Sequence, residues 1–144
     1  MRIRVTLPMP PSDNGLYWNM PKGGRTLTSA GKKFRNETKA QISELILGSD
    51  TDGADFEHDI PYELLLFVYF KEVENKTWGQ KRGAQSRYKK QDVSNRQKLV
   101  TDAVMAAIGV DDRHLMRVVL NKREDADDPR VVVIVREIEE AQDG

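Results

Sequence analysis

The sequence contains no cysteine, which excludes a disulfide framework, a thiolate nucleophile and every metal site with cysteine ligands. It contains only two histidines, so a zinc site made of three histidines is excluded as well. We expect no functional role for His58, and a structural or surface role for His114. An enzyme with this composition must depend on carboxylates, lysines or a hard metal ion such as Mg²⁺, which prefers oxygen ligands.

Long hydrophobic runs are also missing. The longest one, Leu64 to Phe70, has seven residues, whereas roughly 20 are needed to span a bilayer. At the N-terminus, prolines interrupt the sequence before the apolar segment of a signal peptide could form. We therefore expect a cytoplasmic protein.

Net charge is zero, with 23 basic and 23 acidic residues, which argues against a simple polycationic nucleic-acid binder. The charges are unevenly distributed, however. Residues 22–35 contain five basic residues, Lys32 and Lys33 among them, and no acidic one. Residues 75–91 also lack acids, and their six basic residues are Lys76, Lys81, Arg82, Arg87, Lys89 and Lys90. This pattern leaves open whether the segments are solvated loops or contacts for phosphate groups.

The periodicity of apolar residues predicts the secondary structure. Alternating or continuous runs predict strands at Arg2–Leu7, Tyr62–Lys71, Leu115–Lys122 and Val131–Ile138. Apolar residues spaced three and four apart predict two helices. The first is capped by Ser29, has apolar positions Phe34, Thr38, Ile42, Leu45 and Ile46, and ends at Gly48; the second runs from Asp92 to Ile108.

A chain of 144 residues has the size of one domain. The predicted order is β-α-β-α-β-β, which fits an α/β (α+β) fold in which two helices pack over one mixed sheet. We expect a single domain of residues 1–144, with a loop at Pro8–Gly15 that continues into the basic segment containing Gly23 and Gly24. The acidic connection at 49–61 and the tail at 139–144 are expected to be flexible.

Polar side chains gather on one face of the second helix. At about 100° per residue, Asn95, Lys98 and Asp102 point away from the core, and Asp92 lies one turn below them. An ordinary solvent-facing helix with Asp92 as its N-cap would show the same pattern. The apolar residues Leu99, Met105 and Ala106 also lie off the predicted core stripe, and they indicate contact with a partner subunit.

Two further carboxylates, Asp111 and Asp112, come directly after this helix. If the next strand runs beside the start of the helix, they could converge with Asp92. Clustered carboxylates repel one another unless a cation lies between them, and Mg²⁺ held by carboxylates and water is typical of phosphodiester chemistry. The basic segment that ends at Lys90 would then deliver a phosphate backbone to the metal.

Three segments together resemble the RusA family of Holliday junction resolvases. They are Leu7 to Asn14 (LPMPPSDN), Asp92 to Lys98 (DVSNRQK) with Asp102, and the Asp111-Asp112 pair after a glycine. The resemblance extends over roughly residues 1–138. It implies a homodimeric, Mg²⁺-dependent (or Mn²⁺-dependent) endonuclease that resolves four-way DNA junctions by paired nicks in recombination and repair, typically carried by phages and prophages.

The resemblance also implies roles for individual residues. Asp92 and Asn95 match the family's Asp-x-Asp-Asn motif, Lys98 its catalytic lysine, and Asp111 and Asp112 its aspartate pair. This makes Asp92, Asp111 and Asp112 the expected metal ligands, and Asp92, Lys98 and Asp112 the expected catalytic residues.

One position departs from the family motif, because Ser94 stands where the motif has its second aspartate. Ser94 could hold a metal-bound water, together with Asn95, or it could cap the helix in a capping box with Gln97. The departure supports a rival hypothesis, in which the protein binds nucleic acid without cleaving it. A metal-dependent RNase is a third hypothesis. Trp78 and Tyr88 in the basic segment could stack on unpaired bases or anchor the loop to the core.

Overall fold

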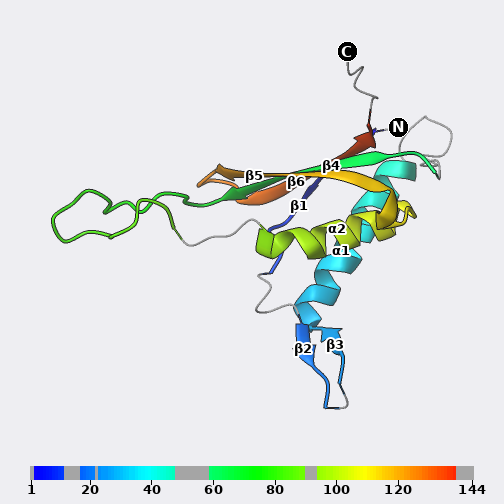
Figure 1. Cartoon of the computed structure of the whole chain (residues 1–144), viewed down its shortest axis with the longest axis horizontal. Helices are drawn as coiled ribbons and strands as arrows, with labels where there is room; N and C mark the ends of the chain where they lie inside the picture. Colours follow the sequence, from blue (N-terminus) through cyan, green and yellow to red (C-terminus); the bar gives the residue numbers. More distant parts are fainter. Residues whose placement is uncertain (1, 12–16, 22, 48–58, 90–93, 139–144) are drawn as a thin grey trace.

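The computed structural model describes residues 2–11, 17–21, 23–47, 59–89 and 94–138 (Figure 1). The elements in chain order are β1 (Arg2–Leu7), β2 (Tyr17–Asn19), β3 (Arg25–Leu27), α1 (Ser29–Leu47), β4 (Tyr62–Phe70), α2 (Ser94–Ile108), the 3₁₀ helix η2 (Asp112–His114), β5 (Leu115–Glu124) and β6 (Arg130–Glu137). Two helices and a mixed four-stranded sheet form one small domain, so the predicted α+β fold is confirmed. None of the described helices is long and apolar enough to cross a membrane.

The main sheet has the strand order β1-β6-β4-β5. Strand β4 pairs in parallel with β5, and the other pairs are antiparallel. Because side chains alternate along a strand, Leu64, Leu66 and Val68 of β4 point to one face and are fully buried there. Valines of β6 and alternate residues of β1 extend this apolar face, which forms half of the core.

Both helices cover the same face of the sheet (Figure 1), with α2 beneath the strands and α1 crossing α2. As a result, α2 is buried on two sides, against the sheet and against α1. Leu99 and Met105 are each only 2% exposed and belong to the core of the chain itself. The prediction that they contact a partner subunit was therefore wrong, although Ala106 is exposed.

Local details differ from the prediction around the first helix. The segment expected to be a loop contains the antiparallel hairpin β2–β3. The helix is capped by Thr28 rather than by Ser29, because the Thr28 hydroxyl accepts a hydrogen bond from the backbone N–H of Gly31 at 3.3 Å. Phe34, Thr38 and Ile42 are buried as expected, whereas Leu45 is 45% exposed. The predicted end at Gly48 lies outside the described residues.

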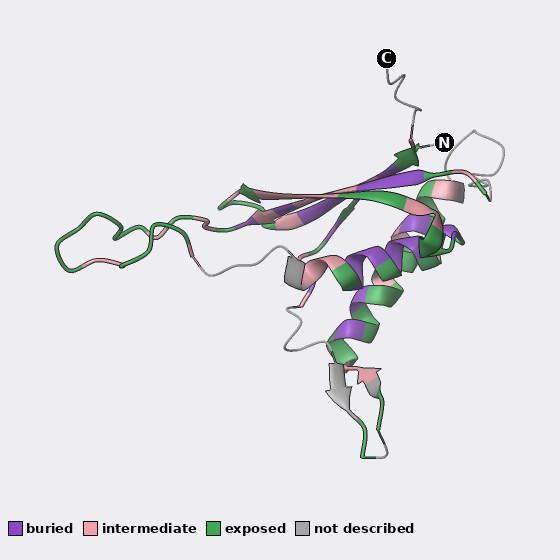
Figure 2. Cartoon of the chain, in the orientation of Figure 1, coloured by how far each residue is buried: buried purple, intermediate pink, exposed green. Residues whose placement is uncertain are grey.

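Residues 71–89, here called the arm, leave the end of β4 and project well beyond the sheet (Figure 1). Most residues of the arm are exposed, and none of them is buried (Figure 2). Its root, the part next to the end of β4, is attached to the sheet, because the backbone N–H of Val73 donates to the Glu124 carboxylate at 2.8 Å. Most of the predicted basic segment therefore lies in the arm, away from the core.

Candidate active site and basic arm

The end of α2 and the 3₁₀ helix form an acidic corner. Asp102, in the last two turns of α2, is close enough to Asp112 for the two carboxylates to interact electrostatically. Asp111 caps the 3₁₀ helix, since its carboxylate accepts a hydrogen bond from the backbone N–H of Arg113 at 2.9 Å. Lys98 lies one turn before Asp102 and interacts with it, so the corner combines carboxylates with a cation.

The carboxylates of this corner respond differently to their surroundings. Desolvation raises the pKa of Asp102; the charge of Lys98 opposes this rise, and the carboxylate of Asp112 adds to it. The hydrogen bond from the Arg113 backbone lowers the pKa of Asp111. Asp102, which sequence reasoning placed on the polar face without a metal role, is thus electrostatically coupled to the Asp111–Asp112 turn.

The start of α2 lies far from the Asp111–Asp112 turn within one chain, because the two are at opposite ends of the helix. A helix from Ser94 to Ile108 is about 20 Å long at 1.5 Å per residue. Strand β5 begins beside the end of α2 and runs back along it (Figure 1). Asp92 and Lys90, and the side chains of Ser94 and Asn95, lie outside the described residues.

A metal centre is not assembled by the described part of one chain. Among these residues, no group of three or more acidic or histidine side chains is placed to hold a metal ion. The chemistry of the corner still fits a hard divalent cation, because carboxylate oxygens are its preferred donors and like-charged carboxylates lie near each other. The corner therefore offers part of a ligand set.

Gln97 bears on the capping-box interpretation of Ser94. The Gln97 amide donates to the Thr101 hydroxyl at 3.1 Å, one turn further along α2. Its side chain is therefore turned away from the start of the helix, where a capping box would require it.

Five of the six predicted basic residues of 75–91 lie in the arm, and they fall into two groups. Three of them pair with glutamates near the root: Lys76 and Lys89 with Glu72, and Arg87 with Glu74. Lys81 and Arg82 are exposed and form no ion pair with any described residue. The five of these predicted cations that the structure describes are thus not equivalent in the fold.

Two cations at the root of the arm were missed by sequence reasoning. The guanidinium of Arg96 and the ammonium of Lys122 lie 5.1 and 5.6 Å from the centroid of the Phe70 ring. They come from the first turn of α2 and from β5. No local sequence signal joins them, because their proximity depends on the packing of α2 against the sheet.

The other predicted contacts lie apart from the arm. Lys32 and Lys33 are exposed in the first turns of α1, near the β2–β3 hairpin (Figure 1), and Lys33 is 3.9 Å from Glu37. His114 is half-buried, and its Nε2 atom lies 3.5 Å from the Nε atom of Arg113. Trp78 and Tyr88 are 47% and 51% exposed, so neither anchors the arm to the core.

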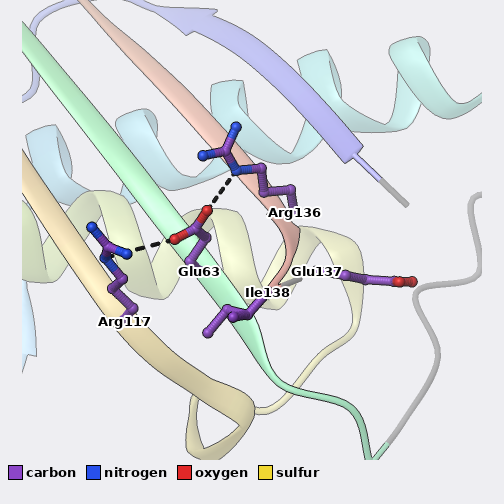
Figure 3. Close-up of a pocket in the computed structure, with 5 residues that line it drawn as sticks. All are labelled: Glu63, Arg117, Arg136, Glu137 and Ile138. Atoms are coloured by element: carbon purple, nitrogen blue, oxygen red, sulfur yellow. Dashed lines mark hydrogen bonds and ion pairs between the residues drawn. The ribbon is translucent and has the colours of Figure 1, made fainter. Parts of the chain in front are cut away.

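The sheet face that the helices leave open carries a cavity of about 260 Å³ (Figure 3). Glu63 on β4 is 7% exposed, and its carboxylate accepts a hydrogen bond from Arg136 of β6. Arg117 of β5 lies 3.7 Å from the other carboxylate oxygen. The three charges connect three neighbouring strands, and we assign them a structural role. Sequence reasoning did not find them, because the arginines that pair with Glu63 lie on other strands, far from it in the sequence.

Comparison with known families agrees with these observations. The family model Endodeoxyribonuclease RusA matches residues 8–136, which is most of the 144-residue chain. The chain belongs to the RusA family. No curated protein sequence matches it.

Membership of the RusA family makes this protein a nuclease that hydrolyses phosphodiester bonds of DNA. The family acts on branched DNA in recombination, as Holliday junction resolvases, and its nucleases depend in general on a divalent metal. The matched region includes α2, the acidic corner and the arm.

Proposed function

We propose that this protein is a Mg²⁺-dependent (or Mn²⁺-dependent) endonuclease that resolves four-way DNA junctions by paired nicks. The family match over residues 8–136 carries the proposal. The acidic corner with its neighbouring lysine supports it, since carboxylates and a cation are the groups that metal-assisted phosphodiester hydrolysis needs. A cytoplasmic location is consistent with this function.

In the proposed site, Asp92, Asp111 and Asp112 would hold the metal, and Ser94 and Asn95 would orient ligands around it. A metal held there would supply an activated water molecule and positive charge next to the scissile phosphate. Lys98 donates hydrogen bonds to phosphoryl oxygens on which negative charge develops in the transition state. Asp102 orients the Lys98 ammonium, to which it is electrostatically coupled.

The dimensions of α2 support a dimer. Asp92 precedes Ser94 by two residues, which span at most about 7 Å of extended chain. The Asp111–Asp112 turn lies beyond the other end of a helix about 20 Å long. A second copy of the chain would bring both groups into one metal site by supplying its Asp111–Asp112 turn to the start of the first copy's α2. Paired nicks also need two equivalent sites.

The proposed DNA contacts are the basic groups of residues 75–91 and of α1. They are Lys76, Lys81, Arg82, Arg87, Lys89, Lys90, Lys32 and Lys33. A protein with zero net charge has no general attraction to DNA, so binding must come from such local groups.

Nicking of a synthetic four-way DNA junction tests the proposal. Wild-type protein should cut it in Mg²⁺ or Mn²⁺ but not in EDTA. Asp92→Asn and Asp112→Asn should reduce cutting by at least about 10²-fold and leave junction binding equal or stronger, because each change removes a ligand and a negative charge that faces phosphate. Asp127→Asn, at an exposed aspartate between β5 and β6, is the matched control. Undiminished cutting by both site variants would refute the site.

A non-catalytic DNA-binding protein is the second candidate, and Ser94 in place of a carboxylate favours it. It predicts tight junction binding with no cutting by the wild type. Ser94→Asp adds a hard ligand. If the wild type is inactive, this variant should cut the junction. If the wild type is active, the variant should need a lower Mg²⁺ concentration for half-maximal cutting. An RNA junction in the same assay separates both candidates from an RNase.

A further inference from the structure

The arm is an exposed projection whose two sides are held together by hydrogen bonds. Its two sides are joined by backbone hydrogen bonds from Asn75 to Arg87 at 2.8 Å and from Lys89 to Val73 at 2.9 Å. The Asn75 side chain also donates to the carbonyl of Ser86 at 2.7 Å. Ion pairs from Glu72 and Glu74 reinforce the same region. These residues, 72–77 and 84–89, are here called the neck, and they connect the far end of the arm to the sheet (Figure 1).

The far end, here called the tip, consists of residues 78–83. It is closed by a hydrogen bond of 2.9 Å from the backbone N–H of Ala84 to the Thr77 hydroxyl. Two turns shape it, with bonds from Gln80 to Thr77 and from Gly83 to Gln80. A Cβ at Gly83 would lie 1.7 Å from the Thr77 carbonyl oxygen, so only glycine permits this closure. The tip therefore has a specific conformation.

Charge is distributed unequally between neck and tip. Lys76, Lys89 and Arg87 of the neck are paired with glutamates. At the tip, Lys81 and Arg82 are exposed and form no ion pair with any described residue. The free energy of binding a phosphate is more favourable for an unpaired cation than for a cation whose ion pair with a carboxylate must first be broken. The tip is therefore the stronger phosphate-binding part of the arm.

Trp78 begins the tip. Its side chain is 47% exposed and makes no hydrogen bond or ring contact with the described residues. An exposed tryptophan on an ordered projection, beside two unpaired cations, has the composition of a site that stacks on nucleobases while its cations hold the backbone. Tyr88 is equally exposed, but it lies in the neck, where the Arg87 guanidinium lies 5.3 Å from its ring centroid.

We propose that Trp78 stacks on the bases that a DNA branch point leaves uncovered, while Lys81 and Arg82 bind the adjacent phosphates. The inference rests on the proposed function and narrows its set of DNA contacts to the tip. A continuous duplex covers both faces of each internal base pair, whereas a branch point leaves or readily opens a free face. Stacking by Trp78 therefore favours branched over linear DNA, and the phosphate contacts favour neither.

Binding in EDTA, which prevents cutting, tests this role with the full chain. Affinities are measured for a four-way junction and for a linear duplex of the same sequence. Trp78→Ala should weaken junction binding by roughly five- to a hundredfold, which is the range for loss of one stacked base, and should leave duplex binding within about twofold. Trp78→Phe should restore much of the preference. Tyr88→Ala, the loss of an equally exposed aromatic ring from the neck, should not change it. Unchanged thermal unfolding verifies that each variant is folded.

The cations are tested by two double variants that remove the same charge. Lys81→Ala with Arg82→Ala should lower the slope of log affinity against log salt by about two for both DNAs. Lys76→Ala with Arg87→Ala, at the neck, should change it by much less. Equal slopes for the two double variants would contradict the division between tip and neck.

The outcomes separate this inference from the proposed function. If the wild type prefers the junction and Trp78→Ala keeps the full preference, the stacking role is refuted and the proposed function stands. If the wild type binds junction and duplex equally, the proposed function fails and the stacking role fails with it.

Discussion

At the scale of single residues, the polar face of α2 is the clearest case in which a sequence pattern has two physical explanations. Lys98 and Asp102 are both exposed there, one turn apart. As a surface ion pair they would stabilise the helix by only about 0.3–0.5 kcal/mol. Asp102 also interacts electrostatically with Asp112 of the acidic corner. An isolated surface ion pair would have no such neighbouring carboxylate.

Replacement of Lys98 distinguishes these explanations. Lys98→Ala should slow junction cutting by on the order of 10²-fold, because it removes a donor to the developing phosphoryl charge. The melting temperature should fall by no more than a few degrees. Lys39→Ala, at an exposed lysine of α1, is the control for loss of a helical lysine. Cutting at a normal rate would mean that Lys98 is only a surface residue paired with Asp102.

At the scale of elements, the arm shows how a polar segment becomes ordered without a core of its own. Glu72 accepts hydrogen bonds from both Lys76 and Lys89, and these bonds lower the pKa of Glu72 from its ordinary 4.5 to about 2. A carboxyl group with a lowered pKa stabilises the ordered state above its ordinary pKa, and this contribution is lost as the pH falls through the lowered value.

Acid titration of Glu72 is the corresponding measurement. Its carboxyl carbon, followed by NMR, should titrate with a midpoint near 2, and the hydrogen bonds of the neck should persist at pH 4. Lys76→Met removes the donor that makes the largest contribution, and it should move the midpoint upward toward 4.5. A midpoint near 4.5 in the wild type would mean that the neck is not held by these pairs in solution.

At the scale of the whole molecule, the question is where two copies would meet. Leu99 and Met105 lie in the core of the chain and are not available. Strand β5 is at an edge of the sheet, and Met116 and Val118 on it are 65% and 39% exposed. This edge begins directly after the acidic corner, so contact through it would bring Asp111 and Asp112 near the second copy.

The mass in solution tests the dimer. Light scattering should report about twice the chain mass of 16.4 kDa. Met116→Glu with Val118→Glu should convert the protein to a monomer and abolish cutting, because charges at both positions oppose burial of the edge. Leu45→Glu, at a residue of α1 that is 45% exposed, should keep the dimer. A wild-type monomer that still cuts junctions would exclude a metal site shared between chains.

The sequence by itself determined the parts that depend on local periodicity. The four strands of the main sheet and both helices were predicted close to their observed positions, because alternation and helical spacing record which face of each element is buried. The family motifs also identified the nuclease family, since their order and spacing can be recognised in the sequence alone.

The tertiary structure decided everything that depends on which elements meet. The helical spacing of α2 could not show that α1 covers its second side, so Leu99 and Met105 were assigned to an interface and lie in the core. The spacing of charges in residues 75–91 could not show which of them pair with Glu72 and Glu74. The electrostatic interaction of Asp102 with Asp112, and the burial of Glu63 between two arginines, likewise depend on the tertiary arrangement, which no local pattern records.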